Sequence, residues 1–307
     1  MKTIIITGAG GFIGRALARY FTASGYTVYG LDRLDSEKAP LSSLAKYIQA
    51  ELPSPIFRDL LQQWRPDAIL HCAGRASVTA AMENPQSDYV DGPALTFDLL
   101  ENVRINSPKC IFLLLSSAAV YGEPRFLPVN ENVVPQPISA YGFHKWQSEL
   151  ICREFASLFG LRTASARVFS AYGPGLRRQV IWDITRKALL DPEVHLQGTG
   201  KESRDFIHVN DIARGLETLM NGTPSRGEVY NLASGQETRI ADLAALILKI
   251  LNSTKTLQFS GKLPPGTPRN WRADISSISR LGFKPEISIE TGVTDFVEWS
   301  RREIAGV

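Results

Sequence analysis

The sequence has few cysteines and no long apolar run. Its three cysteines, Cys72, Cys110 and Cys152, are far apart in the chain and follow neither the paired spacing of metal ligands nor a disulfide framework. We therefore expect a protein of the reducing cytoplasm with no bound metal. The longest unbroken apolar runs, such as Cys110 to Leu115, are far shorter than the roughly 20 residues of a membrane-spanning helix, so no membrane partner is expected.

The chain also lacks a large excess of charge of one sign. The chain carries 34 basic and 31 acidic residues, for a formal net charge of +3, and no segment forms the basic stripe that binds a phosphate backbone. Nucleic acid is therefore not an expected partner. The four histidines lack metal-ligand spacing. With 307 residues, 44% of them hydrophobic, the chain can bury the core of one large domain or two modest ones, and a globular enzyme is expected.

Apolar segments rich in β-branched residues alternate with segments of helical periodicity. The helical segments include Gly14 to Ser24 and Pro93 to Asn106, in which apolar residues recur at helical spacing. Such alternation predicts parallel βαβ units and an α/β fold with a Rossmann-type doubly wound parallel sheet. Its strands are apolar throughout because helices cover both faces. The predicted strands are Thr3–Thr7, Tyr26–Leu31, Ala68–Cys72, Ile111–Ser116 and Thr163–Val168.

A glycine-rich loop follows the first predicted strand. The stretch from Gly8 to Gly14 matches G-x-x-G-x-x-G and leads directly into a helical segment. Glycines let the backbone turn tightly, approach a pyrophosphate and pack the helix on the sheet, while the helix N-terminus attracts negative charge. Strand, loop and helix in this order predict a dinucleotide cofactor. The residues expected to bind it are Gly8, Gly11, Phe12, Ile13 and Gly14.

Acidic residues follow at positions that could face the adenosine. Asp32 comes at the end of the second predicted strand, where a carboxylate accepts hydrogen bonds from the ribose hydroxyls and repels a 2′-phosphate. NAD is therefore favoured. NADP stays open because the adjacent Arg33 could accommodate the phosphate, although Arg33 can equally be a solvated surface charge. Asp59, beside Leu60, follows a possible third short strand and could face the adenine; the alternative for Asp59 is a helix N-cap.

The pattern of predicted elements changes after about residue 167. Turn-rich stretches such as Tyr172 to Gly175 and Leu263 to Pro268 separate shorter elements there. We expect residues 1–167 to form the dinucleotide-binding domain, to which the chain returns over residues 209–232. Residues 168–208 and 233–307 are expected to form a smaller C-terminal α/β lobe that binds the substrate.

Three polar side chains could carry chemistry at the strand ends. Tyr141 and Lys145 stand at i and i+4 of a helical segment, so both point to one face. A nearby cation stabilises a phenolate, which can exchange a proton with an alcohol or a ketone. Alone, this pair is more often a surface pair, but Ser117 ends a strand at the edge where doubly wound sheets bind ligands. Ser116 points to the other side of that strand. The hypothesis is a catalytic group of Ser117, Tyr141 and Lys145.

These motifs stand in order along almost the whole chain: Gly8–Gly14, His71–Gly74, Ser116–Gly122, Tyr141–Lys145, Arg167–Gly175, Arg204–Val209 with Asp211, and Arg272–Ile275. Together they resemble the extended short-chain dehydrogenase/reductases, the NAD-dependent epimerase/dehydratase family that acts on nucleotide-diphosphate sugars. The resemblance implies that Ala73, Gly74, Tyr141 and Lys145 also contact the cofactor. It further implies a homodimer built from helices around residues 91–106 and 141–159.

The resemblance also implies residues for the substrate end. Arg204 corresponds to the family's arginine that contacts the substrate diphosphate, a role that suits the planar guanidinium. The alternative for Arg204 is an ion pair with Asp205 or Asp211. Arg269 and Arg272 are further candidates, and one of the two is expected to reach the diphosphate.

Two departures from the family concern the ligand contacts. Ser117 and Ser170 are implied to contact the substrate, but Ser170 stands where most members have asparagine, a residue with more hydrogen-bond donors. Asp91 likewise stands where many members have asparagine, in the helix after the predicted strand Ala68–Cys72. Hydrogen bonding at both places is expected to differ from the family's pattern.

Ala118 and Ala119 limit the classes of reaction that the site could catalyse. Family members that dehydrate sugars carry Asp-Glu directly after the catalytic hydroxyl, and decarboxylases usually keep the glutamate, whereas alanine cannot exchange a proton. The leading hypothesis is therefore an NAD-dependent nucleotide-sugar 4-epimerase. The alternative is an NAD(P)H-dependent reductase of a nucleotide 4-keto-6-deoxysugar. The stretch Leu263–Arg269 resembles the corresponding part of such reductases. A catalytically silent cofactor-binding subunit is the third hypothesis, because fold alone does not establish function.

Overall fold

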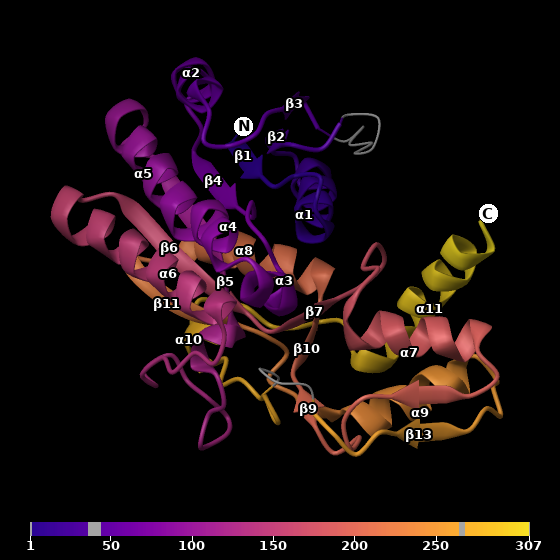
Figure 1. The fold of residues 1–307 in the computed structure, drawn as a ribbon. Coiled ribbons are helices and arrows are strands. Elements are labelled where there is room, and N and C mark those ends of the chain that lie inside the picture. The colour runs from indigo at the N-terminus through magenta and orange to yellow at the C-terminus, as the bar shows by residue number, and fades with distance from the viewer. Residues whose placement is uncertain (1, 36–43, 264–267, 307) are drawn as a thin grey trace.

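The computed structural model describes residues 2–35, 44–263 and 268–306, and in this part of the chain seven parallel strands form the central sheet, in the order β11-β6-β5-β4-β1-β2-β3 (Figure 1). β1 lies between β4 and β2, so the chain winds outward from the centre in both directions, and the switch point is at the carboxyl ends of β1 and β4. The predicted doubly wound fold is confirmed. The strands are β1 (Thr3–Thr7), β2 (Thr27–Asp32), β3 (Lys46–Gln49), β4 (Ala68–His71), β5 (Ile111–Ser117), β6 (Arg162–Val168) and β11 (Arg226–Leu232).

Helices cover both faces of this sheet (Figure 1). Side chains alternate along a strand, so Ile4 and Ile6 of β1 enter the core on one face, whereas Ile5 enters the core on the other. Burial on both sides explains why the strands are continuously apolar. The first core is shared with α1 (Phe12–Ala23) and α8 (Val209–Gly222), and the second with α2 (Pro55–Trp64), α5 (Leu95–Asn106) and α6 (Ala140–Phe159).

Short helical segments lie between the strands and the longer helices. α3 (Val78–Glu83), α4 (Pro85–Tyr89) and the π-helical turn η1 (Val90–Ala94) lead from β4 into α5, and the 3-10 turn η2 (Ala118–Tyr121) directly follows β5. Both connections leave the sheet at its carboxyl edge, where the glycine loop also lies. This edge therefore gathers the segments in which the site residues were predicted.

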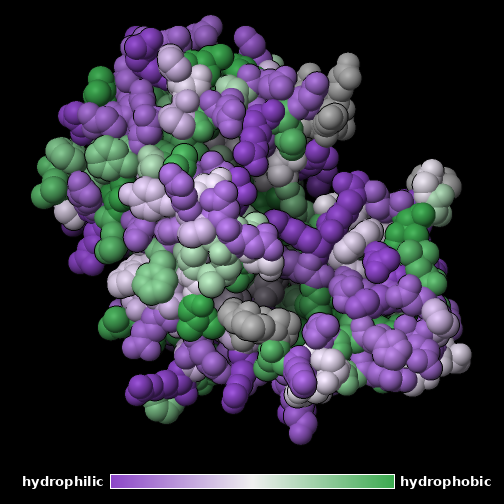
Figure 2. All heavy atoms as spheres, in the orientation of Figure 1, coloured by the Kyte–Doolittle hydropathy of each residue, from purple (hydrophilic) through white to green (hydrophobic). Residues whose placement is uncertain are grey.

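A second group of elements stands beside the sheet (Figure 1). Its helices α7 (Gln179–Leu190), α9 (Ile240–Ile250) and α11 (Ile289–Ala305) share an apolar core of their own with β8 (Val194–Leu196). The surface is hollowed between this group and the large sheet (Figure 2). The remaining elements are β7 (Ser170–Tyr172) paired with β10 (Phe206–His208), β9 (Ser203–Arg204) paired with β12 (Thr238–Arg239), β13 (Leu257–Phe259) paired with β8, and α10 (Ser276–Ser279).

The predicted strands agree with β1, β2, β4, β5 and β6 to within one residue at each end. The helix predicted from Pro93 begins as α5 at Leu95, because Pro93 lies in the π-helical turn η1, where its missing N–H is tolerated. Among the described residues, no helix has both the length and the apolar character required to cross a bilayer.

Candidate active site

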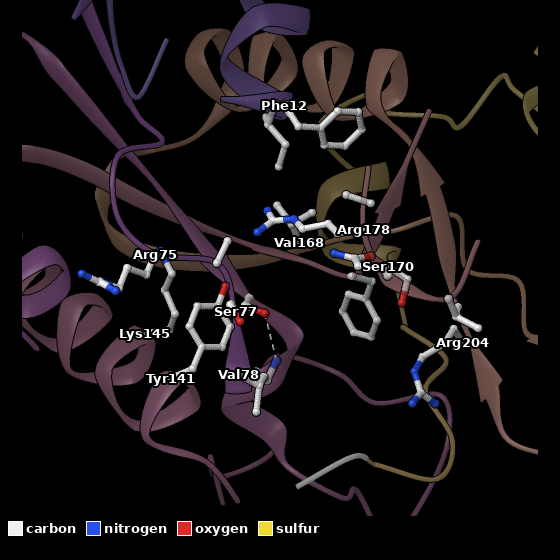
Figure 3. Close-up of a pocket in the computed structure, with 18 of the residues that line it drawn as sticks. Phe12, Arg75, Ser77, Val78, Tyr141, Lys145, Val168, Ser170, Arg178 and Arg204 are labelled. Carbon is white, nitrogen blue, oxygen red and sulfur yellow. Dashed lines mark hydrogen bonds between the residues drawn. The ribbon is translucent and has the colours of Figure 1, made fainter. Parts of the chain in front are cut away.

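A cavity of about 680 Å³ opens at the carboxyl edge of the central sheet. Figure 3 shows residues of its wall, with Phe12 from the start of α1 on one side, Tyr141 and Lys145 from α6 on another, and Arg204 from β9. The structure thus brings predicted cofactor, catalytic and substrate residues to one space. The predicted residues that line the cavity are Gly8, Gly11, Phe12, Ile13, Gly14, Gly74, Ser117, Tyr141, Lys145, Ser170 and Arg204.

Gly8 and Gly14 are required by the geometry of the loop after β1. Gly8 has a φ of 71°, in the left-handed region that favours glycine, and a Cβ there would lie 2.6 Å from the nitrogen of Ala73. A Cβ on Gly14 would lie 2.1 Å from the carbonyl oxygen of Gly8, so a side chain would push α1 away from the loop. No side chain caps the start of α1, which leaves its first N–H groups available to a pyrophosphate. This cradle fits a dinucleotide.

Asp32 is fixed beside this loop. Its Oδ2 accepts a hydrogen bond from the N–H of Gly10 at 2.9 Å, and its Oδ1 accepts one from the N–H of Leu34 at 3.0 Å. The carboxylate is half-buried at the end of β2, the place that the sequence predicted for it. The side chain of Arg33 is 59% exposed, and its Nη1 lies 4.0 Å from Oδ2 of Asp91.

Asp59 does not come directly after the third strand, as the sequence had suggested. That strand is β3, and Asp59 lies inside α2, where its side chain is 61% exposed and accepts a hydrogen bond from Nε of Arg58 at 3.1 Å. Leu60 is buried in the core under α2, and neither residue is among those described as lining the cavity. Ala50 follows β3 instead, and its N–H donates to the carbonyl of Asp32 at 2.8 Å. β3 was difficult to predict from its residues, because this edge strand is half-exposed and mixes polar with apolar residues.

Ser117, Tyr141 and Lys145 all face the cavity. Ser117 is the last residue of β5, and its Oγ accepts a hydrogen bond from the N–H of Ala119 at 3.2 Å. Nζ of Lys145 lies 5.9 Å from the ring centroid of Tyr141 and donates to the carbonyl oxygen of Leu115 at 2.9 Å. This bond attaches the ammonium group to the strand that ends in Ser117. The group therefore has a phenol, a neighbouring cation and a hydroxyl at one edge of the sheet.

The start of α6 approaches the end of β5 very closely. Ser139 caps the helix, its Oγ accepting from the N–H of Gly142 at 3.2 Å. A Cβ on Gly142 would lie 2.5 Å from the carbonyl oxygen of Ala119, so only glycine allows the helix to pack against η2 at this distance. Tyr141 precedes this contact and is therefore placed near Ser117. Ala118 and Ala119 themselves are buried in η2 and bring no carboxylate to the site.

Arginine and lysine dominate the charged lining of the cavity. Arg75, Lys145, Arg178 and Arg204 line it, whereas Glu202 is the acidic residue among the described lining residues. The carboxylate of Glu202 accepts hydrogen bonds from the N–H groups of its own turn at Thr199 and Gly200, at 3.0 and 2.9 Å. The field in the cavity is therefore positive, which favours ligands that carry diphosphates.

Arg75 and Arg178 were missed by the sequence analysis. Arg178 precedes α7 as its N-cap residue, and it lies between Phe12 and Ser170 in the close-up (Figure 3). The next residue, Gln179, has a φ of 67°, a strained backbone conformation for a residue other than glycine. The available signal was proximity in the chain, since both arginines come within a few residues of blocks that carry predicted site residues.

Arg204 is held by backbone carbonyls rather than by a carboxylate. Its Nη1 donates to the carbonyl oxygens of Ser203 at 2.6 Å and Arg269 at 3.0 Å, and its guanidinium lies 5.5 Å from the ring centroid of Trp271. Burial lowers the pKa of Arg204 to about 10, so the group stays charged near neutral pH. The alternative ion pairs do not form, because Asp205 accepts from Ser234 and Asp211 pairs with Arg214.

Arg269 and Arg272 are not among the described lining residues. The side chain of Arg269 is 74% exposed, with its Nε 3.5 Å from Glu123, and Nε of Arg272 donates to the carbonyl oxygen of Gly235 at 3.2 Å. Residues 264–267 of the stretch that resembles 4-keto-sugar reductases lie outside the described residues.

Two histidines near the site have ordinary partners. His71 ends β4, with its Nδ1 2.8 Å from Oγ1 of Thr7, and burial together with the charge of Lys145 lowers its pKa to about 3. Nδ1 of His144 lies 2.6 Å from Oδ2 of the buried Asp88. The described part of the chain contains no group of three side chains that could hold a metal ion.

The glycine cradle at the switch point, with a tyrosine and a lysine across the cavity, places the chain among the dinucleotide-binding α/β enzymes. It belongs to the NAD dependent epimerase/dehydratase family, whose model matches residues 4–233. Over 308 residues it is 28% identical to a putative UDP-glucose 4-epimerase of Methanocaldococcus jannaschii, with 97% of this chain and 98% of the relative covered.

Solved structures agree with this assignment. The UDP-glucuronic acid 4-epimerase of Bacillus cereus, solved in complex with UDP-glucuronic acid and NAD, superposes with a TM-score of 0.90 at 26% identity, covering 98% of this chain and 99% of that one. The UDP-glucose 4-epimerase of Thermotoga maritima, solved with UDP-glucose, also gives a TM-score of 0.90, at 27% identity and the same coverage.

Proposed function

We propose that the protein is an NAD-dependent nucleotide-sugar 4-epimerase. The observation that carries the proposal is the convergence of Ser117, Tyr141 and Lys145 on the cavity that also contains the glycine cradle. The site has the groups needed to move one proton at a sugar oxygen, and alanines stand where a dehydratase needs carboxylates. The relatives named 4-epimerases, each covered almost from end to end, support the same activity.

In this reaction Tyr141 exchanges the proton of the sugar 4-hydroxyl. The ammonium of Lys145 stabilises the phenolate that accepts the proton, and the hydroxyl of Ser117 hydrogen-bonds the reacting oxygen and steadies charge there. Gly8, Gly11 and Gly14 would hold NAD in the cradle, where it would supply a reversible hydride acceptor for the sugar carbon. The contact between Lys145 and Leu115 keeps the cation from moving away between the two halves of the reaction.

The substrate class is a nucleotide-diphosphate sugar, with UDP-hexoses and UDP-hexuronates the first candidates because relatives of both kinds align over the whole chain. Arg204 contacts the diphosphate, and Ser170 lines the same cavity. Residues 168–208 and 233–307 form the substrate lobe, and residues 1–167 with 209–232 form the cofactor domain. The cavity volume suits a cofactor and a substrate of this size in contact.

The test is direct. Purified protein is incubated without added cofactor with UDP-glucose, UDP-galactose, UDP-glucuronic acid and UDP-galacturonic acid, and the products are separated by chromatography. Interconversion of a C4-epimeric pair is expected. Conversion that consumes stoichiometric NAD(P)H with 4-keto-sugars, and none without it, would instead identify the reductase. Dinucleotide binding without turnover of any nucleotide sugar would identify a silent subunit.

We also propose that the protein is a cytoplasmic homodimer joined through α5 and α6. Large apolar side chains on these helices are exposed: Phe97, Ile105, Leu150 and Leu158 at 47%, 63%, 47% and 71%. Such a patch is unusual for a monomer, and α5 and α6 of the two copies would bury it isologously. Light scattering during gel filtration should give twice the chain mass, and Leu158→Glu should give the monomer. The three cysteines, all unpaired thiols, fit a reducing compartment.

A further inference from the structure

Asp91 lies between two arginines that come from different strand ends. Nε of Arg75 donates to Oδ2 of Asp91 at 3.0 Å, and Nη1 of Arg33 lies 4.0 Å from the same oxygen. The side chain of Asp91 is 26% exposed, whereas that of Arg33 is 59% exposed. Arg75 is therefore the firm partner that fixes the carboxylate in place, and Arg33 is the looser partner drawn toward it.

The topology places this row of charges over the cofactor cradle. Arg33 directly follows β2, Arg75 follows β4, and β1 lies between these two strands. A line from Arg33 through Asp91 to Arg75 therefore crosses the carboxyl end of β1, where the loop from Gly8 to Gly14 begins. The backbone of η1 also lies close to the segment after β4, since a Cβ on Gly74 would lie 3.0 Å from the carbonyl oxygen of Asp91.

Arg33 is the side chain that could accept a 2′-phosphate. An arginine beside the adenosine ribose accommodates the phosphate of NADP, whereas a carboxylate at the end of β2 accepts the hydroxyl of NAD. Both oxygens of that carboxylate, on Asp32, already accept backbone N–H groups, so Asp32 cannot turn away. Arg15, the other guanidinium beside the loop, donates to the carbonyl of Gly10 at 2.7 Å and is present in every variant considered below.

Asp91 disfavours the binding of a 2′-phosphate by Arg33 in two ways. Its carboxylate neutralises the guanidinium, so a phosphate would have to displace an existing partner. It also places a second negative charge at the same rim, and like charges a few ångström apart repel. A 2′-phosphate carries nearly two negative charges at neutral pH, whereas the 2′-hydroxyl of NAD carries none. The same carboxylate therefore penalises NADP and leaves NAD unaffected.

We propose that Asp91 is a cofactor-selecting residue, which acts with Asp32 to favour NAD over NADP by holding Arg33 away from the 2′ position of the ribose. The inference rests on the dinucleotide binding in the proposed function and is independent of whether the reaction is epimerisation or reduction.

The experiment compares two affinities in a mutant cycle. Cofactor-stripped protein is titrated by calorimetry with NAD and with NADP, using the wild type, Asp91→Asn, Arg33→Gln and the double variant. Asparagine keeps the volume and an oxygen acceptor for Arg75 and removes only the charge. Asp59→Asn is the matched control, since it removes a carboxylate from an exposed arginine pair away from the cavity. Asp91→Ser is the second variant, and thermal unfolding verifies that each variant is folded.

Asp91→Asn should raise the affinity for NADP relative to NAD by about tenfold, since it removes one repulsion and frees one cation. Arg33→Gln alone should leave the ratio close to that of the wild type, and added to Asp91→Asn it should cancel the gain, so the two changes are not additive. Asp59→Asn should change nothing. An unchanged ratio in Asp91→Asn and Asp91→Ser, equal weakening of both cofactors, or a gain that survives Arg33→Gln would overturn the inference. A wild type that binds neither dinucleotide would overturn the proposed function as well.

Discussion

Glu149 and Arg167 form a buried, bidentate ion pair behind the end of β5. Nη2 of Arg167 donates to Oε2 of Glu149 at 2.7 Å and Nε donates to Oε1 at 3.0 Å, with both side chains 4% exposed. Oγ of Ser116 donates to Oε1 of the same glutamate at 2.5 Å, so this hydroxyl belongs to the buried network, whereas Oγ of Ser117 accepts from the N–H of Ala119. Glu149 stands eight residues after Tyr141 on α6, so this network fixes the helix that carries the tyrosine against β5 and β6.

Replacement of this glutamate should destabilise the fold. Glu149→Gln leaves the guanidinium of Arg167 buried without its counter-charge, and breaking such a pair costs about 3 kcal/mol or more. Urea unfolding measures the change in the free energy of unfolding. The control is Glu101→Gln, whose exposed pair with Arg104 contributes little to stability because solvent screens it. Equal losses for the two variants would show that the buried network has no special role in stability.

Loss of the phenol should stop the chemistry without emptying the site. Tyr141→Phe removes the proton carrier, so turnover should fall by about 10³-fold or more, while the dissociation constant for NAD should stay within about threefold because the cradle is intact. Steady-state rates and cofactor titration measure the two effects. Tyr89→Phe, in an exposed tyrosine of α4, should leave both unchanged. Undiminished turnover in Tyr141→Phe would remove this residue from the mechanism.

Arg204 should govern substrate affinity rather than cofactor affinity. Arg204→Gln removes charge-assisted hydrogen bonds to the diphosphate, so KM for the nucleotide sugar should rise about 10- to 100-fold. Arg204→Lys should recover only part of the loss, since an ammonium lacks the planar fork. Arg177→Gln, in an exposed pair with Glu303, is the control. A rise in the dissociation constant for NAD equal to the rise in KM would place Arg204 at the cofactor instead.

His71 should make the fold sensitive to acid. Its pKa is lowered to about 3 in the folded protein by burial and by Lys145, and returns to about 6.5 in the unfolded chain. Between these values only the unfolded chain binds the proton, so stability is complete above pH 6.5 and is lost as the pH falls, by about 1.4 kcal/mol per unit. The free energy of unfolding of wild type and His71→Asn, measured from pH 7 to 5, should fall more steeply in the wild type. Parallel pH profiles would contradict this assignment.

The parts of the site that the sequence revealed are those in which residue type and position in an element are tied by chemistry. Gly8 and Gly14 are needed where backbone atoms nearly touch. The pair of Tyr141 and Lys145 could be predicted because helical spacing sets which side chains share a face. Both signals are local. The strand ends could be placed because the strands are continuously apolar, so Ser117 could be assigned to the carboxyl edge.

The residues that the sequence did not reveal depend on contacts between distant segments. Arg75 and Arg178 enter the cavity only because separate loops meet there, and an isolated arginine in a sequence looks like any surface charge. The prediction for Asp59 failed for a local reason, because the edge strand β3 has too little apolar periodicity to be placed from the sequence. Asp59 belongs to the following helix. The position of Arg269 relative to Arg204 is set by a backbone carbonyl, to which sequence patterns give no clue.

The edge strand β11 joins the large sheet late in synthesis. It pairs with β6 from Arg226 to Leu232, with a register shift between Arg226 and Glu228, yet residues 169–225, which include elements of the neighbouring lobe, must emerge from the ribosome before it. Until then β6 presents an open row of backbone donors and acceptors, which is a template for pairing with other chains. A fragment ending near residue 200 would keep that edge permanently and should aggregate, so this protein cannot be divided into two separately foldable halves by a single cut after β6.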